Sequence, residues 1–177
     1  MKDEGGMRRR VHATSLPAAF PARSARGDHI LRTEIVLPRP RDEVFAFFSA
    51  AENLGRITPP ELSFRILTPL PVAMREGALI EYRLGLFGLS FTWRTLISRW
   101  DPPYAFTDEQ LKGPYHMWVH THRFDEVPGG TRVSDEVRYR LPLPVVPLLL
   151  QRLCVEIALY RLSLSAAALT TELRQRY

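Results

Sequence analysis

The chain has 177 residues, of which 45% are hydrophobic and 24% charged, so it fits one globular domain with a substantial core. The formal net charge is +5, yet residues 1–29 carry +3 of it and the remaining residues contain no concentrated basic patch, which argues against a nucleic-acid-binding protein. The single cysteine, Cys154, excludes an intramolecular disulfide and predicts a reducing, cytoplasmic location.

The N-terminal segment differs in composition from the rest of the chain. Residues 1–28 are rich in Arg, Ala, Pro, Gly and Ser and lack apolar periodicity, which predicts a disordered basic extension before a folded domain at residues 29–177. No apolar stretch follows the basic residues, so we expect no export signal. The longest apolar runs are too short for stable membrane insertion.

Apolar and polar residues alternate over residues 30–37, which predicts a half-buried strand. Two short helices are expected next. The acidic pair Asp42-Glu43 suits the first turn of one helix, and the second covers residues 50–56.

Six further strands follow by the same alternation, separated by turns that contain Gly and Pro. Their centres lie at residues 62–66, 80–84, 91–98, 106–110, 118–124 and 133–139. Residues 148–176 then contain no Pro or Gly and predict one long helix of about 28 residues. The expected fold is therefore α+β. A curved seven-stranded antiparallel sheet wraps on a long C-terminal helix, with two short helices after the first strand and space left between sheet and long helix.

The segment from Asp108 to Phe124 is the most informative stretch for function. Side chains on a strand alternate between two faces, so Trp118, His120, His122 and Phe124 share one face, which the aromatic residues mark as buried. Two imidazoles are thereby carried into an apolar interior. A buried polar group needs a partner or a ligand, so this face is the expected site.

The same alternation predicts the residues that face the interior of the curved sheet. We expect Arg161, on the long helix, at the mouth of the cavity. Aromatic residues would supply area and shape, and a few polar groups would orient a ligand. The predicted ligand-binding residues are Tyr82, Trp93, Asp108, Gln110, Trp118, His120, His122, Tyr139 and Arg161.

Three interpretations of the two histidines stay open. Each imidazole is satisfied structurally by a neighbouring acid, or it contacts a ligand carbonyl or hydroxyl, or it acts as an acid or base. In the last case His120 or His122 would be the base and Asp135 would orient it, so these three are the catalytic candidates, and none is assigned a catalytic role. A register slip of one residue would turn Asp108 to solvent and Glu109 inward.

The same face also carries residue types that can bind a metal ion. Two histidines at i and i+2 can converge, and Asp108 or Asp135 could supply a third ligand. A His-x-His pair alone is a weak signal and no further Cys or His is placed to help, so the sequence predicts no metal and no cofactor.

Three segments carry a resemblance to a known family. They are PRPRDEVFAFFSAAENLGRITPPELSF at residues 38–64, WDPPYAFTDEQLKGPYHMWVHTHRF at residues 100–124, and Tyr160-Arg161 in the closing helix. Together with the order of elements, they resemble the START-related, Bet v 1-like (SRPBCC) superfamily, in its bacterial branch of polyketide cyclase/dehydrase-like and ligand-binding domains. The resemblance covers residues 30–177. It implies a helix-grip fold with a deep hydrophobic cavity that binds lipids, polyketides or other apolar molecules.

The superfamily includes enzymes that cyclise or dehydrate and many proteins that only bind, and it has no common catalytic motif. The leading prediction is therefore a binding or carrier protein, without catalysis, for a small and mainly hydrophobic molecule. The alternatives are a polyketide cyclase/dehydratase that uses a cavity histidine, and an interaction domain without a ligand. The expected partners are the small ligand alone or a second copy, as monomer or homodimer.

Overall fold

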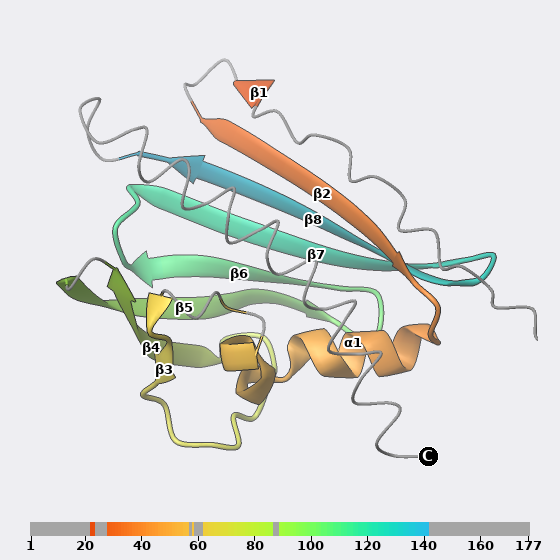
Figure 1. The fold of residues 1–177 in the computed structure, drawn as a ribbon, viewed down its shortest axis with the longest axis horizontal. Helices are drawn as coiled ribbons and strands as arrows, with labels where there is room; N and C mark the ends of the chain where they lie inside the picture. Colours follow the sequence, from red (N-terminus) through yellow and green to blue (C-terminus); the bar gives the residue numbers. More distant parts are fainter. Residues whose placement is uncertain (1–21, 24–27, 57, 59–61, 87–88, 142–177) are drawn as a thin grey trace, which may run out of the picture.

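The computed structural model describes residues 22–23, 28–56, 58, 62–86 and 89–141 (Figure 1). The predicted helix over residues 148–176 lies outside these described residues, as do Arg161 and most of the predicted extension at residues 1–28. Two short helices follow the first long strand, as the sequence predicts, and they are α1 (Arg41–Ser49) and η1 (Ala51–Arg56).

The strands form one antiparallel sheet in the order β1-β2-β8-β7-β6-β5-β4-β3. The seven predicted strands are all present, and the sheet gains an eighth, β1, from two residues that pair with β2. The strands are β1 (Ala22–Arg23), β2 (His29–Leu37), β3 (Arg65–Ile66), β4 (Leu79–Leu86), β5 (Leu89–Asp101), β6 (Ala105–Lys112), β7 (Met117–Val127) and β8 (Gly130–Arg140).

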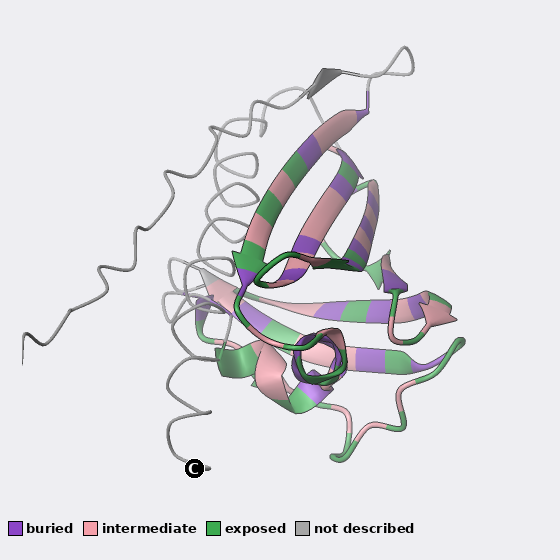
Figure 2. Cartoon of the chain, turned by 90° about the vertical axis from the view of Figure 1, so that its right-hand side faces the viewer, coloured by how far each residue is buried: buried purple, intermediate pink, exposed green. Residues whose placement is uncertain are grey.

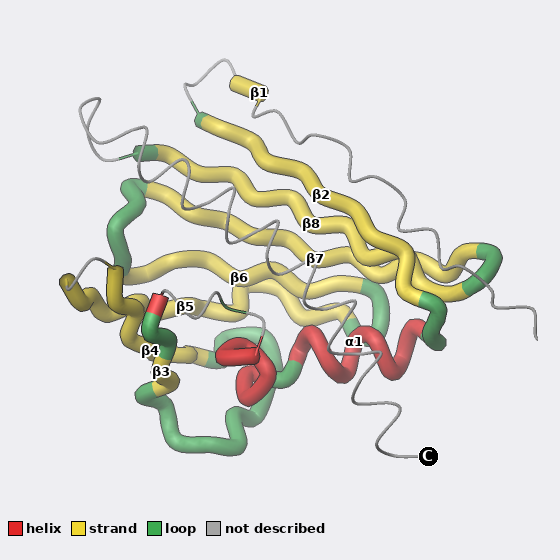
Figure 3. The backbone as a smooth tube through the Cα atoms, viewed as in Figure 1, coloured by secondary structure: helices red, strands yellow, loops and turns green. Residues whose placement is uncertain are grey.

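The sheet is strongly bent, and Figure 2 shows its two ends running in clearly different directions. Two register shifts between β5 and β6, at Arg94/Thr95 and at Ile97/Arg99, add bends within the sheet, because an extra residue on one strand increases its local twist. The two short helices lie together at one end of the bent sheet (Figure 3). This arrangement of the described residues agrees with the predicted α+β class.

Helix α1 begins after Pro40 and packs its apolar side on the sheet. Proline suits a helix start because its missing N–H needs no partner there. The acidic pair of the first turn stays toward solvent, whereas Val44, Phe45, Phe47 and Phe48 are buried. The Phe45 ring lies 5.3 Å from Phe124 of β7, edge to face, so the helix is anchored by aromatic packing.

Asp28 lies at the start of the described domain and is buried, with only 2% of its surface exposed. Its carboxylate accepts a hydrogen bond from Arg140 Nε at 2.8 Å. This pair joins the entry to β2 to the end of β8, which is its neighbour in the sheet. A buried carboxylate is tolerated here because a guanidinium neutralises it.

No helix among the described residues is both long enough and apolar enough to cross a membrane.

The core beneath α1, which includes Val44, Phe45, Phe124 and Val133, is expected to be sensitive to the removal of buried methyl groups. Val133 is 0% exposed, and a Val133→Ala change removes two buried methyl groups and leaves a cavity. We expect the free energy of unfolding to fall by about 2 kcal/mol. Val36→Ala is the matched control, because the same atoms are removed at a position that is 49% exposed, and its cost should stay below about 0.5 kcal/mol. Urea unfolding of both variants checks this; equal costs would contradict the core assignment.

Candidate functional site

A pocket lies between the inner face of the sheet and the two short helices. It holds about 1200 Å³ of space between protein atoms, a figure that includes solvent at its mouth. Most of its wall is apolar or aromatic. The lining residues are Phe48, Ser49, Ala50, Ala51, Leu54, Thr58, Leu62, Phe64, Met74, Ile80, Tyr82, Leu84, Phe91, Trp93, Thr95, Ile97, Phe106, Asp108, Tyr115, Trp118, His120, His122 and Asp135.

The structure brings most of the predicted site residues to this pocket. Six of the nine predicted ligand-binding residues line it, and so does the catalytic candidate Asp135. The six are Tyr82, Trp93, Asp108, Trp118, His120 and His122. Alternation on β4, β5, β6, β7 and β8 therefore assigned the inner face correctly at these positions.

Gln110 and Tyr139 are not among the lining residues. The Gln110 side chain instead donates to the carbonyl of Tyr115 at 2.7 Å and accepts from its N–H at 3.3 Å, so it fastens the turn between β6 and β7. Tyr139 is 0% exposed, and its ring stacks on His29 at 5.0 Å. It is part of the core behind the pocket.

The pocket also has a wall that the sequence interpretation missed. Ser49, Ala50 and Ala51 connect α1 to η1, and Leu62 and Met74 lie in the segments that follow. Ser49, Ala50, Ala51 and Met74 lie outside the predicted strands, and Leu62 belongs to the predicted strand at residues 62–66, which was not assigned to the site. The apolar run from Val44 to Phe48 was the available sequence signal that this end of α1 lies near the site.

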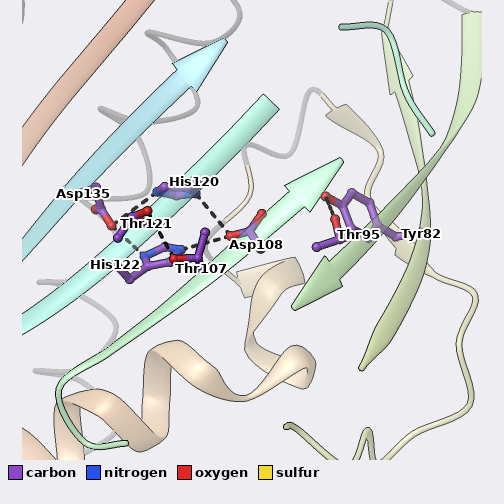
Figure 4. A network of polar contacts seen from close by, with 8 residues as sticks. All are labelled: Tyr82, Thr95, Thr107, Asp108, His120, Thr121, His122 and Asp135. Atoms are coloured by element: carbon purple, nitrogen blue, oxygen red, sulfur yellow. Dashed lines mark hydrogen bonds and ion pairs between the residues drawn. The ribbon is translucent and has the colours of Figure 1, made fainter. Parts of the chain in front are cut away.

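Four side chains from three neighbouring strands form what we call the His–Asp cluster: Asp108 on β6, His120 and His122 on β7, and Asp135 on β8 (Figure 4). The sheet register brings them together, because Asp108 pairs with His120 and His122 pairs with Asp135. Cross-strand partners on one face have adjacent side chains. The two imidazole rings lie 3.8 Å apart between centroids.

Each carboxylate of the cluster contacts both imidazoles. Asp108 Oδ2 lies 3.6 Å from His120 Nδ1 and 3.3 Å from His122 Nε2. Asp135 Oδ1 lies 3.3 Å from His120 Nε2 and 2.6 Å from His122 Nδ1. All four side chains are largely buried. Their exposed fractions are 6% for His120, 8% for His122, 11% for Asp135 and 17% for Asp108. Both nitrogens of each ring therefore face a carboxylate oxygen.

Burial and charge shift the cluster's protonation equilibria in opposite directions. Burial acts to lower the pKa of His122, but the charges and hydrogen-bonding contacts of Asp135 and Asp108 outweigh it and raise that pKa to about 9. Burial also lowers the pKa of His120, assisted by the neighbouring His122 charge. Burial acts to raise the pKa of Asp135, yet the two imidazoles hold it well below its usual range.

We expect the metal-free protein to lose stability as the pH rises above neutrality. The pKa of His122 is raised from 6.5 to about 9, so its protonated ring stabilises the fold fully below pH 6.5, and this stabilisation is lost as the pH passes 9. The loss is on the order of 3 kcal/mol. The lowered pKa of Asp135 keeps this carboxylate charged throughout the window. The lowered pKa of His120 adds stability only as the pH rises through 6.5, where the unfolded ring loses its proton, so neither group changes stability between pH 7.5 and pH 9.5.

Urea unfolding in the presence of a chelator, at pH 7.5 and pH 9.5, measures about 2 kcal/mol of this loss. The His122→Gln variant is the comparison, because it cannot take up the proton and should show a smaller fall. An equal fall in both proteins would contradict the assignment to His122.

Two further polar features belong to the pocket wall. The Trp93 indole N–H is buried and has no hydrogen-bond partner among the described residues. Tyr82 Oη and Thr95 Oγ1 lie 3.3 Å apart and form a hydroxyl pair (Figure 4). An unpaired buried donor in a pocket wall is suited to a ligand acceptor, because leaving it unpaired costs free energy.

Solved structures with the same fold share little sequence with this chain. Protein Ms6760 from Mycobacterium smegmatis matches with a TM-score of 0.63 and 16% identity over 88% of this chain and 99% of that chain. The ginseng major latex-like protein 151 from Panax ginseng matches at 0.59 and 12% over 80% and 97%. The di-domain ARO/CYC StfQ from the steffimycin biosynthetic pathway matches at 0.63 and 13% over 79% and 50%. These likenesses show the fold.

Sequence comparisons place the chain in a family. No curated protein matches the chain. A profile described as Bacteriophage Mu, Gp36 matches residues 135–177 alone, about a quarter of the chain, which is too little to show membership. The profile described as polyketide cyclase / dehydrase and lipid transport matches residues 37–153, about two thirds of the chain. The matched part includes α1 and all the residues that line the pocket, the His–Asp cluster among them. The resemblance to the SRPBCC superfamily is thus confirmed, and the chain belongs to the polyketide cyclase/dehydrase and lipid transport family.

Proposed function

We propose that this protein binds or carries a small, mainly hydrophobic molecule with one or two polar groups, held in the pocket between the sheet and the short helices. The observation that carries the proposal is the composition of the pocket wall. Apolar and aromatic side chains form most of it, and polar atoms are confined to a few points. Such a wall favours an apolar body and fixes its orientation through few hydrogen bonds.

The polar points are separated along the wall. The Trp93 N–H lies on β5, and the His–Asp cluster lies on β6, β7 and β8. The aromatic wall connects them, because the Trp93 and Trp118 rings meet edge to face at 5.4 Å and Trp118 lies next to His120. A ligand that satisfies both points has a flat or flexible apolar body with an acceptor at one end and a second polar group at the other.

The comparisons support this class of ligand. The family's description names lipid transport beside polyketide cyclisation and dehydration. StfQ, which shares the fold, is an ARO/CYC of a biosynthetic pathway. Lipids and polyketides, which the family's description names, have large apolar parts and carbonyl or hydroxyl oxygens.

A cyclase or dehydratase is the second candidate, and the specific observation that favours it is a pair of imidazoles in the pocket wall beside a carboxylate. In such a reaction a histidine would take a proton from carbon between two carbonyls. The carbanion would form a C–C bond to another carbonyl carbon, and the resulting alkoxide would take up a proton. Loss of water would follow in a dehydration. This candidate predicts a changed product, whereas a carrier returns its ligand unchanged.

A matched pair of ligands tests the binding proposal. We expect 2-acetylnaphthalene, which has a carbonyl acceptor, to bind saturably in the pocket and quench tryptophan fluorescence. Trp93→Phe keeps an aromatic ring but removes the N–H, so it should weaken binding of the ketone by about 2- to 10-fold, the worth of one neutral hydrogen bond. Binding of 2-ethylnaphthalene, which lacks the acceptor, should change less.

Trp100→Phe is the control, since Trp100 packs on Phe45 and is not among the lining residues. Chromatography of the ketone after incubation distinguishes a carrier from an enzyme that alters it. Non-saturable binding of both compounds to the wild-type protein would overturn the proposed pocket function.

A further inference from the structure

The geometry points to a binding site for one divalent transition-metal ion, such as Zn²⁺, held by Asp108, His120 and His122 with one coordination position open to the pocket. One donor atom from each of the three residues lies within 4.8 Å of the other two. Two imidazoles and one carboxylate form a donor set that suits zinc and its first-row neighbours. The inference that a metal binds here does not depend on the proposed function. Only the role given below to the open coordination position rests on it.

The distances fit a tetrahedral ion. Zinc bonds of about 2.0–2.1 Å place neighbouring ligand atoms about 3.4 Å apart. Asp108 Oδ2 lies 3.3 Å from His122 Nε2 and 3.6 Å from His120 Nδ1. Two of the three separations therefore match a tetrahedral ion, and the donor atoms of the two rings lie within 4.8 Å of each other.

Asp135 is placed as a positioning residue for both histidines. Its Oδ1 contacts the far nitrogen of each ring, His120 Nε2 at 3.3 Å and His122 Nδ1 at 2.6 Å. Metal-binding histidines commonly direct the second ring nitrogen at a carboxylate, which holds the tautomer and ring orientation. Asp108 thus lies on the metal side of the two rings and Asp135 lies behind them, which is an arrangement common in metal sites.

The tautomers that Asp135 favours leave lone pairs on the other side. A neutral imidazole has one N–H and one lone pair. If each ring presents its N–H to Asp135, His120 Nδ1 and His122 Nε2 both turn lone pairs toward the Asp108 carboxylate. Three acceptors then face one another. In the metal-free protein a proton on His122 Nε2 satisfies them through its contact with Asp108 Oδ2 at 3.3 Å, and a metal ion would take the place of that proton.

The surroundings leave room for a fourth ligand. All three candidate ligands line the pocket, so an ion held by them would face its contents. Three protein ligands with one open position are typical of zinc sites that accept a water or a substrate oxygen. On the proposed function, that position takes the polar end of the apolar ligand. A ring that binds metal has no free lone pair at the metal, so a loaded site would also exclude direct base catalysis by these histidines.

The test uses the full chain, stripped with a chelator, loaded with excess Zn²⁺ and passed through gel filtration. We expect about one equivalent of zinc to remain on the wild-type protein. Asp108→Asn and His122→Gln should retain none, and Asp135→Asn should lower the zinc affinity by about 10- to 100-fold, measured by competition with a coloured chelator. His116→Gln is the matched control, because it removes an exposed histidine near the start of the same strand and should retain zinc.

The result that would overturn the inference is a wild-type protein that retains no zinc, or equal retention by wild type and Asp108→Asn. Circular dichroism of the metal-free variants shows whether they fold. If they do not, the Co²⁺ spectrum of the wild-type protein decides. Strong visible absorption typical of four- or five-coordinate cobalt supports the site, and the weak spectrum of the six-coordinate aqueous ion contradicts it.

A ligand pair separates this inference from the proposed function. We expect 2-naphthohydroxamic acid, whose oxygens can bind a metal, to bind the zinc-loaded protein at least about 10-fold more tightly than the stripped protein, because the open position accepts oxygen. Zinc retention without binding of any naphthalene compound would leave the metal site standing and defeat the proposed pocket function. Binding of 2-acetylnaphthalene without zinc retention would do the reverse.

Discussion

Replacement of Ala50 by Trp is expected to abolish ligand uptake while the protein stays folded. Ala50 lines the pocket just beyond α1 and is half-buried, so a larger side chain can extend into the pocket without displacing the fully buried core. Its backbone is extended, at φ −82° and ψ 117°, which any L-residue adopts. The indole would take the space of the ligand's apolar body. We expect affinity for 2-acetylnaphthalene to fall at least about 100-fold, or ~2.8 kcal/mol, in a fluorescence titration.

The control introduces the same side chain elsewhere. Val36→Trp adds an indole on β2 at a position that is 49% exposed and not among the lining residues, so it should leave affinity unchanged. Thermal unfolding of both variants verifies that they remain folded. If Ala50→Trp folds and binds as tightly as the wild type, the ligand is held somewhere other than this pocket.

Removal of the Asp135 carboxylate is expected to give the largest loss of stability from a single change in the His–Asp cluster. The Asp135 side chain is 11% exposed and contacts both imidazoles. Asp135→Ala would leave the raised-pKa His122 without its nearest negative charge, and breaking a buried charge pair costs about 3–5 kcal/mol. Urea unfolding of the chelator-treated wild-type and Asp135→Ala proteins at neutral pH measures this loss in the free energy of unfolding.

The matched control is Asp125→Ala, which removes the same group from an exposed position on β7 and should change stability by less than about 0.5 kcal/mol. A second comparison replaces both partners. The His122→Leu/Asp135→Leu double variant removes the charge as well as its partner, so it should recover part of the loss. A double variant as unstable as the sum of its single changes would show that the two side chains do not interact.

The part of the site on the central strands followed from the sequence because alternation is a local property. His120 and His122 are separated by one residue, and the adjacent Trp118 and Phe124 identify their face as buried, as the structure confirms at 8% and 1% exposure. Placement of Asp108 depended on the register across the β6–β7 turn. The observed pairing of Asp108 with His120 agrees with the predicted inward position.

The alternation rule does not detect a bulge. Strict alternation would put Trp100 on the same face as Ser98, yet Trp100 packs on Phe45 and Phe106. The register shift between Ile97 and Arg99 falls at Ser98. It changes which face of the strand the residues after it occupy. No Gly or Pro marks it in the sequence.

Local hydrogen bonding explains another difference. Gln110 occupies an inward position by number, but its amide reaches the backbone of Tyr115 across the turn and not the pocket. A side chain that can satisfy nearby backbone groups is not available to a ligand. The wall formed by Ser49, Ala50 and Ala51 was missed for a different reason, since contacts between helix and sheet depend on tertiary packing.

Native mass spectrometry of the full chain, purified from the cells that express it, is the decisive test of whether the pocket holds a ligand. We expect the protein to carry a noncovalent organic molecule, which solvent extraction identifies as mainly apolar with one or two oxygen groups and which the Ala50→Trp protein lacks. A wild-type protein that carries nothing, and that also fails to take up 2-acetylnaphthalene or decanoic acid in the same spectrometer, would contradict it.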